Sequence, residues 1–264
     1  MTSSQTALIT GASSGIGQAF AKEFAQHGYN LLLTARNKEE LNKTAEEMRS
    51  TYHVNVDTLS LDLNKPSSCQ DLFDWATSQE RPVTCLVNNA GMGNYGKYEE
   101  IPWEKEEELL RINIMVVSEL CHLFIPYFLK NKQGKILNVA SMASFQPGPL
   151  FTTYYASKAY VLNFTEALAL ENKHTPLAIS AICPGPSPTN FFTKANFPAS
   201  SLLMKTSMLP PEKVAKAGYS GLMRKKTVII PSLKYALIPV GSRLFPRKTV
   251  TRISKKFIDI AAKG

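Results

Sequence analysis

The chain has 264 residues, of which 44% are hydrophobic, so it is long enough for one large globular domain but short for two enzyme domains. Its net charge of +9 is unevenly spread. Residues 222–264 contain eleven lysines and arginines but only one acid, Asp259, so this segment carries +10 and the rest of the chain −1. A neutral body with a basic tail does not favour a nucleic-acid-binding protein.

Cysteine and histidine patterns argue against disulfides and metal sites. The four cysteines are far apart and form no CxxC pair, and the four histidines have no metal-ligand spacing. The chain starts without a basic and apolar leader, and no apolar run reaches about 18 residues. We therefore expect a cytoplasmic protein with no metal, no signal peptide and no membrane span.

Short apolar segments alternate with segments of helical periodicity along the chain. Strands are predicted at 6–10, 30–35, 56–62, 84–91, 134–141, 177–185 and 227–231. Helices are predicted at 17–28, 38–52, 67–79, 103–130 and 152–172. Repeated β–α–β units predict an α/β fold, a single doubly wound Rossmann-type domain over residues 1–264, with a seven-stranded parallel sheet and helices on both faces. Ligands bind such sheets at the carboxyl ends of the strands.

A glycine-rich loop, TGASSGIG, follows the first strand at residues 10–17. It opens a helix whose free N–H groups and dipole favour an anion, and its small residues allow close approach of a pyrophosphate. An ordinary tight turn is the alternative. The position between a strand and a helix favours dinucleotide binding. The predicted contacts are Gly11, Ser13, Ser14, Gly15, Ile16 and Gly17.

Arg36 follows the second strand, where a protein that selects NAD usually has an acid. A guanidinium suits the 2′-phosphate of the cofactor, so the sequence favours NADP(H) over NAD(H). A solvated arginine at the start of the next helix is the alternative.

Two further strand ends are predicted to meet the cofactor. After the third strand, Asp62 could accept a hydrogen bond from the adenine amino group, with Leu63 beside it, or it could cap the next helix. After the fourth strand, NNAG supplies small and amide residues, of which Asn89, Ala90 and Gly91 are predicted to contact the cofactor. An ordinary turn is again the alternative.

The stretch FTTYYASKAY contains two adjacent tyrosines ahead of a lysine. Tyr154 and Lys158 are four residues apart and share one helix face, whereas Tyr155 lies about 100° round the helix. A nearby ammonium favours the phenolate and lowers a tyrosine pKa, so we expect Tyr154 to act as an acid or base near neutral pH. We interpret Tyr155 as packing or pocket wall.

Five features in order, TGASSGIG, NNAG, Ser141 after the fifth strand, YxxxK and PGPSPT, resemble the short-chain dehydrogenase/reductase family. The resemblance covers roughly residues 5–230. More narrowly, NVASMASFQPGPLFTTYYASKAYVLNFTEALALE and CPGPSPTNF are similar to NADP-dependent reductases related to 17β-hydroxysteroid and 3-ketoacyl reductases.

This resemblance implies four catalytic residues: Asn113, Ser141, Tyr154 and Lys158. Ser141 would position the substrate oxygen, although Ser144 competes for that role. Lys158 would also hold the nicotinamide ribose. Asn113 would bend a helix and hold a water, the alternative being a structural hydrogen bond to the main chain. The nicotinamide would be flanked by Pro184, Gly185 and Thr189.

The implied activity is reduction of a carbonyl by NADPH. An NAD-linked alcohol dehydrogenase and a catalytically idle dinucleotide-binding regulator are the alternatives. By the same resemblance, the helices at 103–130 and 152–172 would pair with copies of themselves, so a homodimer or homotetramer is expected.

Residues 187–223 are predicted to form a mobile apolar lid over a small apolar ketone, aldehyde or alcohol. Its apolar residues are Phe191, Phe192, Phe197, Leu202, Leu203, Met204 and Met208, and Met92, Phe145 and Pro147 are expected as further wall. Completion of the core is the alternative for each of them.

Residues 232–264 form a basic C-terminal extension in which Val250, Ile253, Phe257, Ile258 and Ile260 roughly follow helical spacing. One interpretation is an amphipathic helix on an anionic membrane. Packing on the body or on another subunit, with a solvated basic face, is the interpretation we favour. Aromatic residues are too sparse for nucleic-acid binding.

Overall fold

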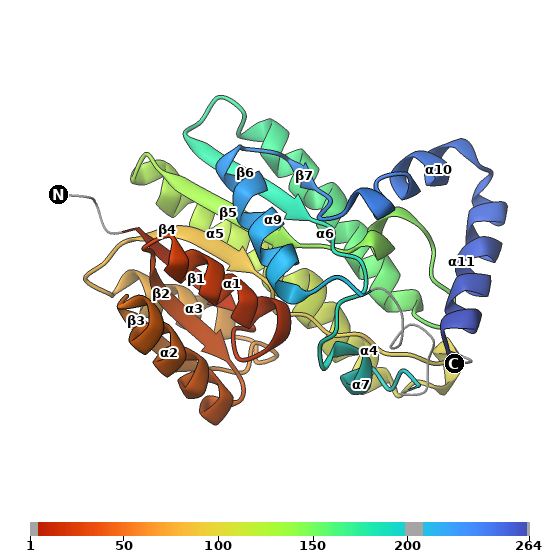
Figure 1. The fold of residues 1–264 in the computed structure, drawn as a ribbon, viewed down its shortest axis with the longest axis horizontal. Coiled ribbons are helices and arrows are strands. Elements are labelled where there is room, and N and C mark those ends of the chain that lie inside the picture. The colour runs from red at the N-terminus through yellow and green to blue at the C-terminus, as the bar shows by residue number, and fades with distance from the viewer. Residues whose placement is uncertain (1–4, 199–207, 263–264) are drawn as a thin grey trace.

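Seven parallel strands form one sheet in the computed structural model, which describes residues 5–198 and 208–262. In chain order the strands are β1 (Thr6–Thr10), β2 (Asn30–Ala35), β3 (Val56–Ser60), β4 (Val83–Asn88), β5 (Gly134–Val139), β6 (Leu177–Ile182) and β7 (Val228–Ile229). Their order across the sheet is β3-β2-β1-β4-β5-β6-β7, and every pairing is parallel (Figure 1). The predicted fold class is confirmed.

Helices cover both faces because successive strand residues point to opposite sides. Ala7 and Ile9 pack with α1 (Gly15–Gln26), α2 (Lys38–Tyr52) and α9 (Pro211–Met223). Leu8 packs on the other face with α3 (Ser68–Thr77), α5 (Val116–Lys130) and α6 (Thr152–Glu171). Strands β1, β2, β4 and β6 are buried at every position, as expected of strands covered on both sides.

The predicted strands extend two or three residues too far at their carboxyl ends. The segments 56–62, 84–91, 134–141 and 177–185 leave the sheet at residues 60, 88, 139 and 182. The residues that follow these strands line the cleft described below, among them Asp62, Asn89, Ser141 and Pro184.

The predicted helix 103–130 consists of three parts: α4 (Trp103–Leu110), a π-helical turn η2 (Arg111–Met115) and α5. By length and hydropathy alone, this stretch is the one described helix that could cross a membrane, and 44% of its most apolar window is buried. Its α5 part packs against the sheet, which accounts for its apolar character.

Helix α9 was not predicted from the sequence; it packs against α1 and buries Val214, Ala215 and Leu222. The C-terminal extension begins with η4 (Leu233–Tyr235) and continues as α10 (Ile238–Leu244) and α11 (Arg247–Ala262). These elements lie at the end of the molecule away from α2 and β3 (Figure 1).

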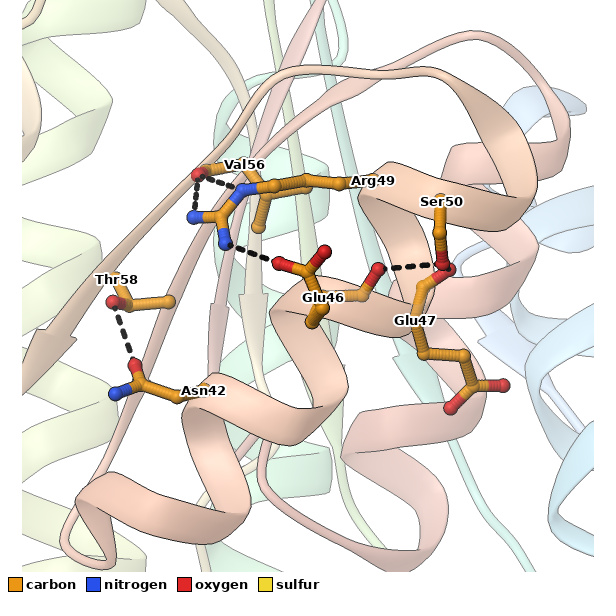
Figure 2. A network of polar contacts seen from close by, with 7 residues as sticks. All are labelled: Asn42, Glu46, Glu47, Arg49, Ser50, Val56 and Thr58. Atoms are coloured by element: carbon orange, nitrogen blue, oxygen red, sulfur yellow. Dashed lines mark hydrogen bonds and ion pairs between the residues drawn. The ribbon is translucent and has the colours of Figure 1, made fainter.

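Side chains of α2 hold the edge strand β3 in place (Figure 2). The guanidinium of Arg49 donates through Nε to the carbonyl of Val56 at 3.2 Å, and it also pairs with Glu46 at 3.5 Å. Thr58 donates to Asn42 at 3.3 Å. This network ties the outermost strand to its helix at a distance from the cleft described below.

Candidate active site

One cleft of about 870 Å³ runs across the carboxyl ends of the strands. It includes the point between β1 and β4 where the strand order reverses, which is where ligands bind sheets of this kind. Apart from Asn113, every residue predicted to be catalytic or to bind the cofactor lines it: Gly11, Ser13, Ser14, Gly15, Ile16, Gly17, Arg36, Asp62, Leu63, Asn89, Ala90, Gly91, Ser141, Tyr154, Lys158, Pro184, Gly185 and Thr189.

The glycine-rich turn needs its glycines for conformation and for space. Gly11 and Gly15 have φ values of +65° and +57°, which favour glycine. A Cβ on Gly17 would collide with the carbonyl of Gly11 and the side chain of Asn89. A Cβ on Gly15 would lie 2.9 Å from a methyl carbon of Thr189, so the turn faces the segment after β6 across the cleft.

Hydrogen bonds join the loop after β4 to the glycine-rich turn. The side-chain amide of Asn89 donates to the carbonyls of Thr10 at 2.9 Å and Gly11 at 3.2 Å. The hydroxyl of Thr10 accepts from the backbone N–H groups of Asn89 and Ala90, both at 3.0 Å. Asn88 points elsewhere and donates to Asn138 in the core at 2.8 Å.

Arg36 is paired with an acid that the sequence analysis did not single out. Its guanidinium donates to Glu108 at 2.9 Å, and the Lys105 ammonium lies 3.7 Å from the same carboxylate. The Arg36 side chain is 60% exposed and all three residues line the cleft. Arg36 is thus a largely exposed arginine that lies before α2, is paired with an acid and lines the cleft.

Asp62 lies at the cleft and holds its own turn. Its carboxylate accepts from the backbone N–H of Asn64 at 3.1 Å. The residue at the N-terminal cap of α3 is Ser67, so the proposed role of Asp62 as cap of that helix is wrong.

Ser141 and Ser144 have different surroundings. Ser141 lines the cleft, begins the short helix η3 (Met142–Phe145), and accepts from the N–H of Ala143 at 3.1 Å. Ser144 is buried, accepts from the backbone N–H of Ser141 at 3.3 Å and donates to the carbonyl of Lys158 at 2.7 Å. Of the two hydroxyls, only that of Ser141 belongs to a residue lining the cleft, and Ser144 supports it from behind.

Asn113 lies in the π-helical turn, fully buried behind the cleft. Its side chain accepts from the N–H of Met92 at 3.0 Å, and donates to the Met92 carbonyl at 2.9 Å and to Ser157 at 3.0 Å. The two hydrogen bonds with Met92 are of the structural, main-chain kind that was the alternative interpretation of Asn113. A Cβ on Gly91 would lie 3.3 Å from both the Asn113 oxygen and the Lys158 nitrogen, so Gly91 separates two closely spaced polar groups.

Tyr154 and Lys158 lie together on α6, but their electrostatics differ from the expectation. Burial raises the pKa of Tyr154, and a hydrogen bond with Ser141 opposes that rise. Burial also lowers the pKa of Lys158 to about 8. Its ammonium donates to the Val139 carbonyl at 2.8 Å and lies 6.0 Å from the centre of the Tyr154 ring. The predicted lowering of the Tyr154 pKa by Lys158 is therefore wrong for this arrangement.

The family model for short chain dehydrogenases matches residues 5–198. A 7β-hydroxysteroid dehydrogenase of Collinsella aerofaciens is 30% identical over 212 residues, which are 80% of this chain and 80% of that protein. The chain belongs to the short-chain dehydrogenase/reductase family. It is therefore an oxidoreductase acting on CH–OH groups, and the predicted family is confirmed.

Solved structures of other short-chain dehydrogenases have the same fold. A short-chain dehydrogenase from Sphingobium yanoikuyae in complex with NADPH is 30% identical, with a TM-score of 0.82 over 90% of this chain and 93% of that one. Another, from Burkholderia phymatum in complex with NAD, is 26% identical with a TM-score of 0.82 over 91% and 92%. Proteins similar to this one therefore bind nicotinamide dinucleotides of both kinds.

The residues of this short-chain dehydrogenase fit a dinucleotide. Helix α1 begins at Gly15 in the glycine-rich turn that lines the cleft, so the free backbone N–H groups of a helix N-terminus lie there, as a pyrophosphate requires. Ser187 is only 5% exposed and lines the cleft, and its hydroxyl has no hydrogen-bond partner among the described residues. A buried hydroxyl of this kind suits a polar group of a bound ligand.

The substrate end of this short-chain dehydrogenase contains residues that the sequence analysis missed. They are Gln146 and Phe151 before α6, Tyr235 and Ile238 near α10, and Phe257, Ile258 and Ala261 on α11. The ring of Tyr235 lies directly over Gly185, where a Cβ would collide with it. Helical spacing at 250–260 predicted a helix there, but not that it would form a wall of the cleft.

Some of the apolar residues expected in the lid and the wall line the cleft. Met92, Phe191, Phe192 and Phe197 line the cleft, and α7 (Phe191–Lys194) carries two of them. Phe145 packs into the core, and Pro147 and Met208 are not among the lining residues, so those expectations are wrong. Leu202, Leu203 and Met204 lie outside the described residues. Residues 211–223 of the predicted lid form α9 and belong to the core.

Proposed function

We propose that this chain is an NADPH-preferring reductase of apolar ketones and aldehydes, with Tyr154 as the proton donor. The observation that carries the proposal is the meeting of Ser141, Tyr154 and Lys158 at one end of a cleft whose other end is a glycine-rich turn. A bound nicotinamide dinucleotide would supply the hydride. The protein supplies orientation, a proton and the exclusion of water.

The side chains divide the remaining work between them. The hydroxyl of Ser141 donates a hydrogen bond to the substrate carbonyl oxygen and holds it beside the Tyr154 phenol. Because burial raises the pKa of Tyr154, the phenol is protonated at neutral pH and acts as an acid in reduction. The Lys158 ammonium stabilises the phenolate that remains. Asn113 positions the loop at Met92 and the helix at Ser157 on either side of this cluster.

The preference for NADPH rests on Arg36. One similar structure holds NADPH and another holds NAD, so the preference is inferred from the residues of this chain. The exposed guanidinium can leave Glu108 and accept a 2′-phosphate, and Lys105 lies close enough to contribute a second positive charge. No acid replaces Arg36 at the end of β2, where NAD-selecting proteins have one.

The substrate class follows from the aromatic wall. Phe151, Tyr154, Phe191, Phe192 and Phe197 form one set of ring contacts, with centroids 5.1 to 6.0 Å apart between neighbours. Such a wall favours a bulky apolar or ring-bearing carbonyl over a sugar. A related 7β-hydroxysteroid dehydrogenase agrees with this size class.

Self-association through α5 and α6 completes the proposal. Exposed apolar side chains on these helices and on the π-helical turn between α4 and α5 include Met115, Leu129, Tyr160 and Leu170. A homodimer or tetramer would cover them. The competing function, an idle dinucleotide-binding regulator, does not require Ser141, Tyr154 and Lys158 to meet at the cleft.

The test is a panel of ketones and aldehydes of increasing size, followed at the NADPH absorbance and repeated with NADH. We expect turnover with bulky apolar carbonyls and a higher kcat/KM with NADPH. A preference for sugars would contradict the proposed substrate class. A preference for NADH would contradict the proposed cofactor. Absence of turnover across the panel, with NADPH still bound, would favour the regulator.

A further inference from the structure

Exposed apolar side chains are concentrated at the C-terminal end of the molecule. Eight of the fourteen exposed large apolar side chains among the described residues lie between residues 233 and 260. They are Leu233, Leu237, Val240, Leu244, Phe245, Ile253, Phe257 and Ile260. We call these eight the tail patch. Single exposed apolar residues are ordinary, but a cluster of this kind marks an interaction surface.

Part of the tail patch is a regular stripe. Leu233, Leu237, Val240 and Leu244 follow the spacing i, i+4, i+7 and i+11 over η4 and α10, and are 91%, 77%, 52% and 76% exposed. Residues at this spacing lie on one side of a helical segment. The apolar side of α10 therefore faces solvent. In a helix that packs on the core, the apolar side faces the core instead.

Helix α11 presents two apolar stripes. Val250, Ile258 and Ala261 are buried against the body with Ser254, whereas Ile253, Phe257 and Ile260 are 59%, 55% and 49% exposed. The packing on the body that we favoured from the sequence is thus correct for one stripe and leaves the other open. Packing on the body alone does not account for the tail patch.

Positive charge surrounds the tail patch. Residues 232–262 contain seven lysines and arginines and one acid, Asp259, which is paired with Lys255 at 2.6 Å. The segment therefore carries a net charge of +6. A two-fold contact between copies would bring two such surfaces together, and like charges would oppose it. Nucleic acid would leave the aliphatic stripes unpaired, because it offers them no apolar surface.

We propose that the tail patch and its cations dock this protein on an anionic lipid surface. Aliphatic and aromatic side chains at helical spacing enter the boundary between headgroups and acyl chains, and lysines and arginines bind lipid phosphates. A lipid surface is the partner that matches both halves of the pattern. A lipid surface offers apolar acyl chains and negatively charged headgroups side by side, and it is wide enough to contact both α10 and α11.

Docking would place the cleft beside the lipid. Phe257 belongs to both surfaces: it is 55% exposed in the tail patch and it lines the cleft with Ile258 and Ala261. Tyr235 and Ile238, next to the α10 stripe, also line the cleft. An apolar substrate dissolved in the lipid could enter past α11 without crossing water. This last step rests on the proposed reductase function, whereas lipid docking does not.

The test is co-sedimentation of the full-length protein with phosphatidylcholine vesicles, with and without phosphatidylserine. We expect binding that requires phosphatidylserine and weakens between about 0.15 M and about 1 M salt, because the screening length falls from about 8 Å to about 3 Å. Arg243→Gln with Lys248→Gln should weaken binding by about fivefold for each cation removed.

The apolar contribution is tested with Leu237→Asp and Leu244→Asp in one protein. Its matched control is Tyr98→Asp with Trp103→Asp, which makes the same charge change at apolar side chains that are 51% and 57% exposed elsewhere. We expect the first variant to stay in the supernatant and the control to bind like the wild type. Turnover of a water-soluble ketone by each variant at the wild-type rate shows that the variant is folded. If the wild type itself reduces no ketone but binds vesicles, the reductase function fails while lipid docking stands.

Three results would overturn the proposal. One is a wild-type protein that binds neither kind of vesicle, and another is equal loss of binding in the control. The third is a tail-patch variant that binds vesicles normally while sedimentation velocity shows a smaller oligomer. That last result would assign the tail patch to contact between copies of the chain.

Discussion

The two ends of the cleft are built differently. The cofactor end consists of turns at the strand ends that are held by hydrogen bonds to the main chain, such as those from Asn89 to Thr10 and Gly11. The substrate end consists of aromatic and aliphatic side chains from α6, α7, η4 and α11. The cofactor end gathers its turns from between residues 11 and 189 of the chain, and the substrate end gathers its side chains from between residues 146 and 261. The two ends therefore differ in how they are held together, by main-chain hydrogen bonds or by side-chain packing, and not in how far apart their residues are in the sequence.

The two ends should therefore respond differently to substitution. A turn held by main-chain hydrogen bonds tolerates little, because each substitution affects backbone conformation or a buried polar group. A wall of side chains can change its shape without changing the sheet beneath it. Substitutions at the cofactor end should therefore alter dinucleotide binding, and those at the substrate end should alter only which carbonyl is reduced.

The largest effect is expected where the two ends meet. Tyr154→Phe removes only the phenolic hydroxyl, so kcat should fall by about a thousandfold while NADPH affinity stays unchanged. Tyr155→Phe is the matched control, because its ring is wall and not proton donor, and kcat should change by less than about threefold. Single-turnover kinetics and NADPH fluorescence measure both quantities. A similar kcat for the two variants would remove Tyr154 from its proposed role.

Lys158 should make stability depend on pH. Its folded pKa of about 8 lies below its ordinary value, so above pH 8 the unfolded state holds a proton that the folded state has lost. Wild-type stability should rise relative to Lys158→Met by about 2 kcal/mol between about pH 7 and about pH 9.5.

Urea unfolding of the two proteins across this pH range provides the measurement. The exposed Lys43→Met is the control, and its difference from the wild type should stay constant with pH. A difference between wild type and Lys158→Met that stays flat or falls with rising pH would show that Lys158 is not deprotonated by burial.

Cofactor selection should respond to the pair formed by Arg36 and Glu108. Arg36→Ala should raise the Kd for NADPH about tenfold or more and leave that for NADH nearly unchanged, because a charge-assisted contact to phosphate is lost. Glu108→Gln should do the opposite and strengthen NADPH binding a fewfold, because the guanidinium is then free to turn to the phosphate. Equal effects on both cofactors would mean that Arg36 does not distinguish them.

The smallest effect is expected at the substrate end. Phe257→Ala should change kcat/KM by about threefold in favour of bulkier ketones, because it removes a half-exposed ring from the wall of the cleft. NADPH affinity should not change, because Phe257 lies at the substrate end. A ladder of ketones of increasing ring size measures this. Loss of cofactor binding in this variant would show that the two ends of the cleft are not separate.

The sequence predicted the cofactor end and the sheet because their signals are local. A glycine-rich turn between a strand and a helix, or a tyrosine four residues before a lysine, can be recognised within a short window. Helix α9 was missed because its glycines, Gly218 and Gly221, weaken the helical pattern, although a Cβ on either would collide with a packed side chain. The pairing of Arg36 with Glu108 joins positions 72 residues apart, and no local pattern contains it.

The substrate end was predicted only in part for the same reason. Phe191, Phe192 and Phe197 were predicted to line the cleft because apolar residues in a loop are unusual. Phe257 and Tyr235 were not, because the basic segment that contains them was interpreted as a surface extension. The place of Phe257 depends on how α11 packs against Phe151 and Phe197, and the ring of Tyr235 lies over Gly185, far from it in the sequence. The shift of the Tyr154 pKa was predicted in the wrong direction because the spacing of residues 154 and 158 reveals a neighbour, but does not reveal that burial raises this pKa.

The most direct test of the account follows the hydride itself. Wild-type protein and Tyr154→Phe would each be given NADPH in which both hydrogens at the reactive carbon of the nicotinamide are deuterium, together with a bulky apolar ketone. We expect deuterium on the carbinol carbon of the wild-type product, seen by NMR, and almost no product from the variant although it binds the cofactor. Product without the label, or equal labelled product from both proteins, would contradict it.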